Sequence, residues 1–182
     1  MVYVSLVILV YQGIANSNLG IISQFTHQNG NNWAGPLSTA LLFLGSGLGC
    51  SYNKYIGKYP FKYCFFVGSL GFILYTALGL IFLKLGFTTT VEVLIFALSF
   101  IAGGTCSIFY NTQFNYINFL SRIDKREVKY FGINIGMAQS SNIFGNLVSA
   151  MLIKPLGQFL AVLVMTIIMM ISAILLLFAR QP

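Results

Sequence analysis

The chain has 182 residues, of which 57% are hydrophobic and only 7% are charged. Because a soluble domain carries about 25% charged residues, this composition predicts a polytopic membrane protein that contacts the lipid bilayer. The net charge of +7 does not indicate nucleic-acid binding, because the basic residues lie in short segments between apolar runs and form no single patch.

The apolar runs predict one all-α domain over residues 1–182, with six transmembrane helices. A spanning helix needs roughly 20 mostly apolar residues, and each run is close to that length. The expected helices cover residues 2–23, 36–51, 61–83, 91–119, 130–152 and 159–178.

The first expected helix follows Met1 directly, as VYVSLVILV. It has no basic leading segment and no small-residue cleavage site, so it predicts a spanning helix and not a signal peptide. Its second half becomes polar. Gln12 and Asn16 are four residues apart and therefore share one face of the helix.

The fourth expected helix is apolar up to Tyr110 and then continues as NTQFNYINFL. Asn111, Asn115 and Asn118 share one face at positions i, i+4 and i+7. A helix that includes them exceeds the hydrocarbon thickness, so it must tilt or leave the membrane in its last turns.

The fifth expected helix has the most polar groups, in the stretch YFGINIGMAQSSNIFGNLVSAML. Gln139, Asn142, Asn146 and Ser149 fall on one face. An amide without a partner costs several kcal/mol in hydrocarbon, so this face must meet protein or a wet cavity.

These carboxamides form one set of candidate cavity-lining residues. The set comprises Gln12, Asn16, Asn111, Asn115, Gln139, Asn142 and Asn146. Two interpretations stay open: the amides bind a ligand in a common cleft, or they pair with one another between helices and stabilise the bundle.

Two pairs of glycines predict close helix packing. Gly132 and Gly136 form a GxxxG pair in the fifth helix, and Gly45 and Gly49 lie in the GSGLG segment of the second. GSGLG is a poor match to a nucleotide-binding loop, because the third glycine of that motif is missing and no strand precedes it.

The basic residues predict the orientation of the chain in the membrane. With six crossings, the segments 52–62 and 121–129 share a side with both termini. That side holds eight of the ten basic residues, namely Lys54, Lys58, Lys62, Arg122, Lys125, Arg126, Lys129 and Arg180. Only Lys84 and Lys154 lie on the other side, so both termini should be cytoplasmic.

No pattern for catalysis, a metal or a cofactor occurs in the sequence. The cysteines Cys50, Cys64 and Cys106 lie in or beside apolar runs without the spacing of a metal site, and His27 is the only histidine. We therefore expect no enzyme, no metal and no cofactor.

The overall pattern resembles the amino-terminal half of a major facilitator superfamily protein. More narrowly, it is similar to the Unc-ninety-three-like branch of that superfamily. FGINIGMAQSSNIFGNLVS at 131–149 resembles the fifth-helix signature FGxxxGxxQSSxxxGNL of the branch. QGIANSNLG at 12–20, GSLGFILY at 68–75 and the elements at 103–104 and 113–116 support it.

The resemblance implies a major-facilitator-type half bundle, and for the best-known members of the branch it implies control of other membrane proteins. One such member regulates a potassium channel, and another escorts Toll-like receptors. The superfamily's loop between helices two and three usually holds an acid ahead of a Gly-Arg/Lys pair. Here Gly57-Lys58 remain, but Lys54 stands in the place of the acid.

The leading hypothesis is therefore a non-enzymatic accessory protein that regulates or escorts another membrane protein, such as an ion channel or a receptor. The alternatives are a secondary transporter of a small uncharged or amphipathic solute and a structural subunit of a membrane complex. The partner would be another membrane protein or a second six-helix half.

Overall fold

The computed structural model describes residues 2–28, 32–56, 58–86 and 88–179, and every regular element in these ranges is a helix. The elements are α1 (Val2–Gln28), α2 (Ala34–Gly49), the 3₁₀ turn η1 (Cys50–Tyr52), α3 (Asn53–Ile56), α4 (Phe61–Leu85), α5 (Thr89–Asp124) and α6 (Glu127–Leu177). Two residues used above, Gly57 and Arg180, lie outside the described ranges.

Four helices, α1, α4, α5 and α6, are long and apolar enough to cross a bilayer, and α2 is a shorter apolar helix of 16 residues. The chain is therefore an integral multi-pass membrane protein whose outer helix faces contact lipid.

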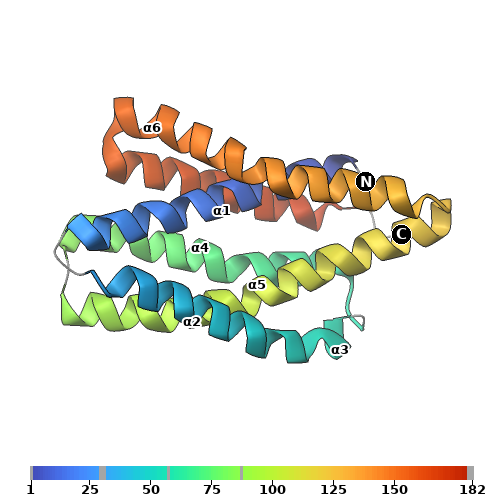
Figure 1. Cartoon of the computed structure of the whole chain (residues 1–182), viewed down its shortest axis with the longest axis horizontal. Coiled ribbons are helices and arrows are strands. Elements are labelled where there is room, and N and C mark those ends of the chain that lie inside the picture. Colours follow the sequence, from blue (N-terminus) through green and yellow to red (C-terminus); the bar gives the residue numbers. More distant parts are fainter. Residues whose placement is uncertain (1, 29–31, 57, 87, 180–182) are drawn as a thin grey trace.

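Helix α6 consists of two limbs that fold back on each other. It runs for 51 residues, about twice the length of one crossing, but at Gly157 the backbone leaves the helix with φ 76° and ψ 167°. Only glycine adopts this conformation without strain. Figure 1 shows the first limb (127–156) and the second limb (158–177), which returns behind it.

The reversal at Gly157 separates the stretches expected to form the last two helices. Lys154 and Pro155 lie between the expected helices 130–152 and 159–178, but the chain does not turn there and both residues are helical. A proline removes one backbone hydrogen bond from the turn before it, but the reversal itself requires the positive φ of glycine.

Two helices are longer than the apolar runs predict. Helix α1 continues to Gln28 and α5 to Asp124, because polar residues at the end of a spanning helix can remain helical where their side chains reach water. Helix α5 ends where Lys125 adopts a left-handed conformation (φ 53°, ψ 37°), and the Arg126 N–H donates to the Ser121 carbonyl at 3.2 Å.

The core lies between α1, α4, α5 and the second limb of α6. Tyr11 of α1 stacks on Phe109 of α5 with ring centroids 4.8 Å apart, and its hydroxyl donates to the Ser69 carbonyl of α4 at 2.9 Å. Met165 and Met169 of the second limb are fully buried in the same cluster. Tyr11 therefore connects three helices through its ring and its hydroxyl.

Glycines set the closest helix contacts. A Cβ built on Gly145 of α6 would overlap the backbone of Gly13 in α1, so these two helices touch through their main chains. Gly45 and Gly49 of α2 lie equally close to α5, where their neighbours include Gly104.

The GxxxG pair of α6 does not make the close helix contact that was expected of it. A Cβ on Gly132 or Gly136 meets no heavy atom within 4 Å. The spacing is right for packing, but these two residues lie on a face of α6 that no described helix covers at this depth. The close contact of the limb is made at Gly145 instead.

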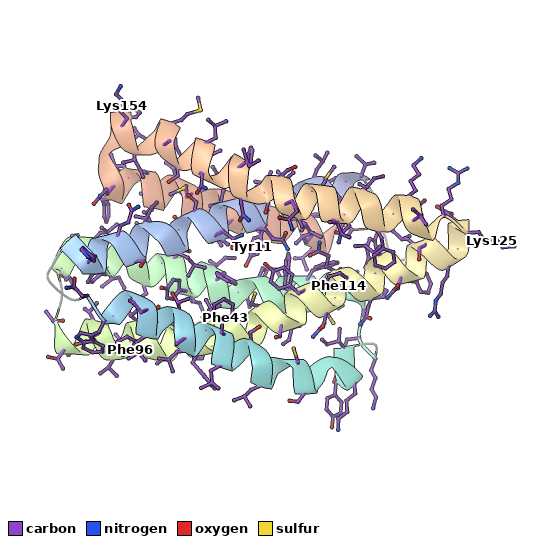
Figure 2. The ribbon with its side chains drawn as sticks, in the orientation of Figure 1. Tyr11, Phe43, Phe96, Phe114, Lys125 and Lys154 are labelled. Carbon is purple, nitrogen blue, oxygen red and sulfur yellow. The ribbon has the colours of Figure 1, made fainter. Side chains whose placement is uncertain are left out.

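The charges separate along the long axis of the bundle. Lys125 lies at the turn between α5 and α6, and Lys154 lies at the opposite end, near the reversal of α6 (Figure 2). Phe61, at the start of α4, packs on Phe119 near the end of α5, which places the lysines of segment 54–62 at the Lys125 end.

Gly145→Ala should destabilise the fold by about 1–3 kcal/mol, because the added methyl group forces the main chains of α1 and α6 apart. The matched variant Gly136→Ala should unfold at the temperature of the wild type or slightly above it, since its Cβ enters open space. Thermal unfolding in detergent measures both, and equal losses of stability would contradict the packing described here.

Candidate functional site in the amide groups of α1, α5 and α6

Three buried carboxamides from three helices form a hydrogen-bonded ladder. Gln12 Nε2 of α1 donates to Gln113 Oε1 of α5 at 2.9 Å, and Gln113 Nε2 donates to Asn134 Oδ1 of α6 at 2.5 Å. The three side chains are only 3–4% exposed. Each amide therefore satisfies part of its neighbour's hydrogen-bonding capacity in a region without bulk water.

The first ladder residue, Gln12, lies next to the close contact of α1 and α6. Gly13, whose main chain touches Gly145, directly follows Gln12 in the chain. On α5, Gln113 belongs to the buried series Cys106, Phe109 and Gln113, which recurs every three to four residues and faces the bundle.

A second amide pair joins α1 and α6 at the surface. Asn16 Nδ2 of α1 donates to Asn142 Oδ1 of α6 at 2.7 Å. Asn16 is half-buried and Asn142 is exposed. Both polar residues selected on α1 are therefore bonded to another helix: Gln12 is bonded to Gln113 of α5, and Asn16 is bonded to Asn142 of α6.

The two α5 amides that were predicted to line a cavity lie beside the ladder but are not part of it. Asn111 and Asn115 are half-buried. The Nδ2 group of Asn111 is buried and has no hydrogen-bond partner, which leaves its two N–H donors available to a further group.

Apart from Asn134, the amides of the first limb of α6 point outward. Gln139, Asn142 and Asn146 are exposed, whereas Ser141, Gly145 and Ser149 on the adjacent face are buried. We call Gln139, Asn142 and Asn146 the amide stripe. The predicted polar face of this limb is therefore divided, with Ser149 inside the bundle and the amide stripe on its surface.

The cavity nearest to the ladder is very small. It has a volume of about 10 Å³ and is lined by Tyr11, Gln12, Asn16 and aromatic residues of α4 and α5, including Phe109. Such a cavity holds about one water molecule, whereas small-molecule sites usually enclose 300–1,000 Å³. The described chain thus has no room for a solute beside Gln12.

The carboxamides of the site form hydrogen bonds and do not titrate. Carboxamides donate and accept hydrogen bonds, but they neither gain nor lose protons near neutral pH. Among the described residues, no group of three or more His, Cys, Asp or Glu side chains could hold a metal ion. The site can pair, orient or bind polar groups.

Of the three ladder residues, only Gln12 belongs to the cavity-lining residues predicted from the sequence. Gln113 lies off the face shared by Asn111 and Asn115, and Asn134 lies off the face of the amide stripe. The spacing of the buried residues Cys106 and Phe109 carried the signal for Gln113, because it continues to Gln113 with a helical period.

Comparison of the chain with known protein families, with curated proteins and with solved structures finds no match in any of the three. The fold and the site are therefore interpreted from the geometry of the chain itself.

Gln113→Leu should destabilise the bundle by about 1–3 kcal/mol, because it leaves Gln12 and Asn134 buried without their shared partner. Gln139→Leu should leave the unfolding temperature unchanged, since Gln139 is exposed. Thermal unfolding in detergent compares the two leucine variants directly. A larger loss for Gln139→Leu than for Gln113→Leu would show that the ladder does not stabilise the fold.

Proposed function

We propose that this chain is a non-enzymatic membrane protein of the Unc-ninety-three-like type, which binds another membrane protein and regulates or escorts it. The observation that carries the proposal is the amide stripe, which lies exposed on the first limb of α6. Two residues of the stripe, Gln139 and Asn146, belong to the fifth-helix signature of that branch that 131–149 resembles.

In the proposed topology the chain crosses the membrane six times, through α1, α2, α4, α5 and the two limbs of α6. Both termini are cytoplasmic, on the side where Lys125 and most other basic residues lie. Six helices so arranged would form a half bundle of the major facilitator type.

The amide stripe would lie deep in the hydrocarbon in this topology. Asn142 is twelve residues from Tyr130 and ten from Leu152, which corresponds to about 15 Å or more from either end of the expected span. An amide exposed to lipid at that depth costs several kcal/mol, and the one hydrogen bond from Asn16 to the Asn142 oxygen leaves the rest of the stripe in need of a further partner.

The surroundings of the stripe favour a protein surface as that partner. Ile143 is 74% exposed and lies between Asn142 and Asn146, and Leu147 is exposed beside Asn146. A face that mixes large apolar side chains with hydrogen-bonding groups suits a protein interface, where both kinds of group can be buried and paired.

The missing acid in segment 52–62 supports an accessory role. Lys54 occupies the position where a transporter of the superfamily usually has the acid that latches its cytoplasmic gate. A protein that binds a partner without cycling between open and closed states does not need this latch.

A secondary transporter is the second candidate, and Asn111 is the observation that favours it. Its buried Nδ2 group has no hydrogen-bond partner and could donate to an uncharged solute. In that case the solute cavity would form between this chain and a second six-helix half, because the cavity at Gln12 holds only about one water molecule.

A photo-cross-linking amino acid at position 146 tests the accessory role in native membranes. It should capture a distinct membrane protein, because position 146 belongs to the proposed interface. The matched control is position 174 on the second limb, where Ile174 is exposed and apolar, and a cross-linker there should capture lipid only.

The two candidates predict opposite results in a second measurement. Reconstituted vesicles that contain the chain, alone or together with the captured protein, should not accumulate solute, and loss of the chain should change the activity or the cellular location of the captured protein. Vesicles that take up a solute, together with no protein adduct from position 146, would falsify the accessory role.

A further inference from the structure

An apolar groove lies at the basic end of the bundle, between α3, the first half of α4, and α5. Its volume is about 330 Å³, and almost all of its lining is apolar. The lining includes Tyr55, Tyr59, Tyr63, Cys64, Val67 and Ile108. The groove is distant in sequence from the amide stripe and uses none of its residues.

Three lysines stand at the tyrosines that line this groove. The ammonium groups of Lys54 and Lys58 lie 5.0 Å and 5.4 Å from the centre of the Tyr55 ring. The ammonium group of Lys62 lies 5.1 Å from the centre of the Tyr63 ring. Cation–π attraction at these distances keeps the positive charges beside the groove.

Segment 53–63 has three positive charges and no negative one. The two acids of the same end of the bundle, Asp124 and Glu127, lie at the turn between α5 and α6, among four further basic residues at 122–129. Glu92 lies in the first turn of α5, whereas the groove borders the second half of that helix, at Ile108. The groove therefore carries a positive potential that suits an anion.

The position of the groove along the bundle matches a membrane interface. Tyr55, Tyr59 and Tyr63 are exposed, and tyrosines concentrate where the hydrocarbon meets the headgroups. Val67 and Ile108 lie one or more helical turns deeper, toward the middle of the membrane. The groove thus has a charged outer rim and an apolar inner end.

We propose that this groove binds an anionic phospholipid of the surrounding membrane. The phosphate and any acidic group of the headgroup contact Lys54, Lys58 and Lys62. One acyl chain lies along the tyrosines toward Val67 and Ile108. Lysine ammonium groups are effective point charges for phosphate, and basic pockets between helices bind anionic headgroups.

The groove has a charged rim and an apolar inner end, and together they distinguish an anionic phospholipid from ligands that match only one of them. A soluble phosphate would leave the apolar groove uncovered, and a neutral phospholipid would leave the lysine charges without partners. An anionic phospholipid satisfies both, and it is present in the membrane that the chain spans.

The charge is tested by native mass spectrometry of the full chain in a neutral detergent, titrated with phosphatidylserine or phosphatidylcholine. The wild type should bind phosphatidylserine more tightly than phosphatidylcholine. The variant Lys54→Gln/Lys58→Gln/Lys62→Gln should bind phosphatidylserine about 100-fold more weakly, because each lysine near an anionic surface contributes roughly a factor of five.

Two control variants accompany the charge test. The variant Lys54→Arg/Lys58→Arg/Lys62→Arg keeps the positive charges and should retain binding. Lys84→Gln/Lys154→Gln removes the two lysines of the opposite end and should also retain it. Wild-type affinity in the triple Gln variant, or equal affinity of the wild type for the two lipids, would overturn the proposal.

The acyl-chain end is tested by filling the groove. Val67→Trp should lower the affinity for phosphatidylserine at least tenfold, because the indole occupies the space of the acyl chain. Leu74→Trp is the matched control, since Leu74 lies two turns away on the same face of α4 and the two side chains are similarly exposed, at 47% and 52%.

A soluble headgroup decides between the membrane lipid and a free anion. Glycerophosphoserine, which has no acyl chains, should fail to compete with phosphatidylserine at equal concentration. Effective competition, or wild-type affinity in Val67→Trp, would assign the lysines to a soluble anion and refute a lipid site. None of these outcomes depends on the proposed accessory function.

Discussion

The pairing of carboxamides away from water is the interaction on which the rest of this bundle depends. Gln12, Gln113 and Asn134 come from α1, α5 and α6, and each would be costly to bury alone. Beside Gln12 in the sequence, Gly13 and Gly145 let the main chains of α1 and α6 touch. Helix packing and polar pairing thus support each other: the glycines set the distance, and the amides set which faces of the helices meet.

Apolar runs predicted much of the fold. A run of about 20 apolar residues signals a crossing wherever it lies in a chain, which is why the expected helices correspond to α1, α2, α4, α5 and the limbs of α6. Helix ends were harder to place, because polar residues such as Gln28 continue a helix that has already left the hydrocarbon.

The contacts between helices could not be predicted in the same way. A GxxxG pair within one helix shows that a close approach is possible, but it does not show where the partner lies. Gly145 and Gly13 lie on different helices, so no spacing within either segment identifies their contact. The same reason explains Gln113, whose importance follows from its position opposite Gln12 and not from its neighbours in the chain.

Helix α5 has a consequence for the outline of the protein beyond the membrane. Its 36 residues extend for about 54 Å, whereas the hydrocarbon is about 30 Å thick. An upright α5 exceeds the hydrocarbon by about 24 Å, so the helix either inclines or carries its last turns, with Lys125, into the headgroup layer, where α6 begins. In either case the turn between α5 and α6, with its basic residues, would lie at the surface of the bilayer, within reach of lipid headgroups and of soluble proteins.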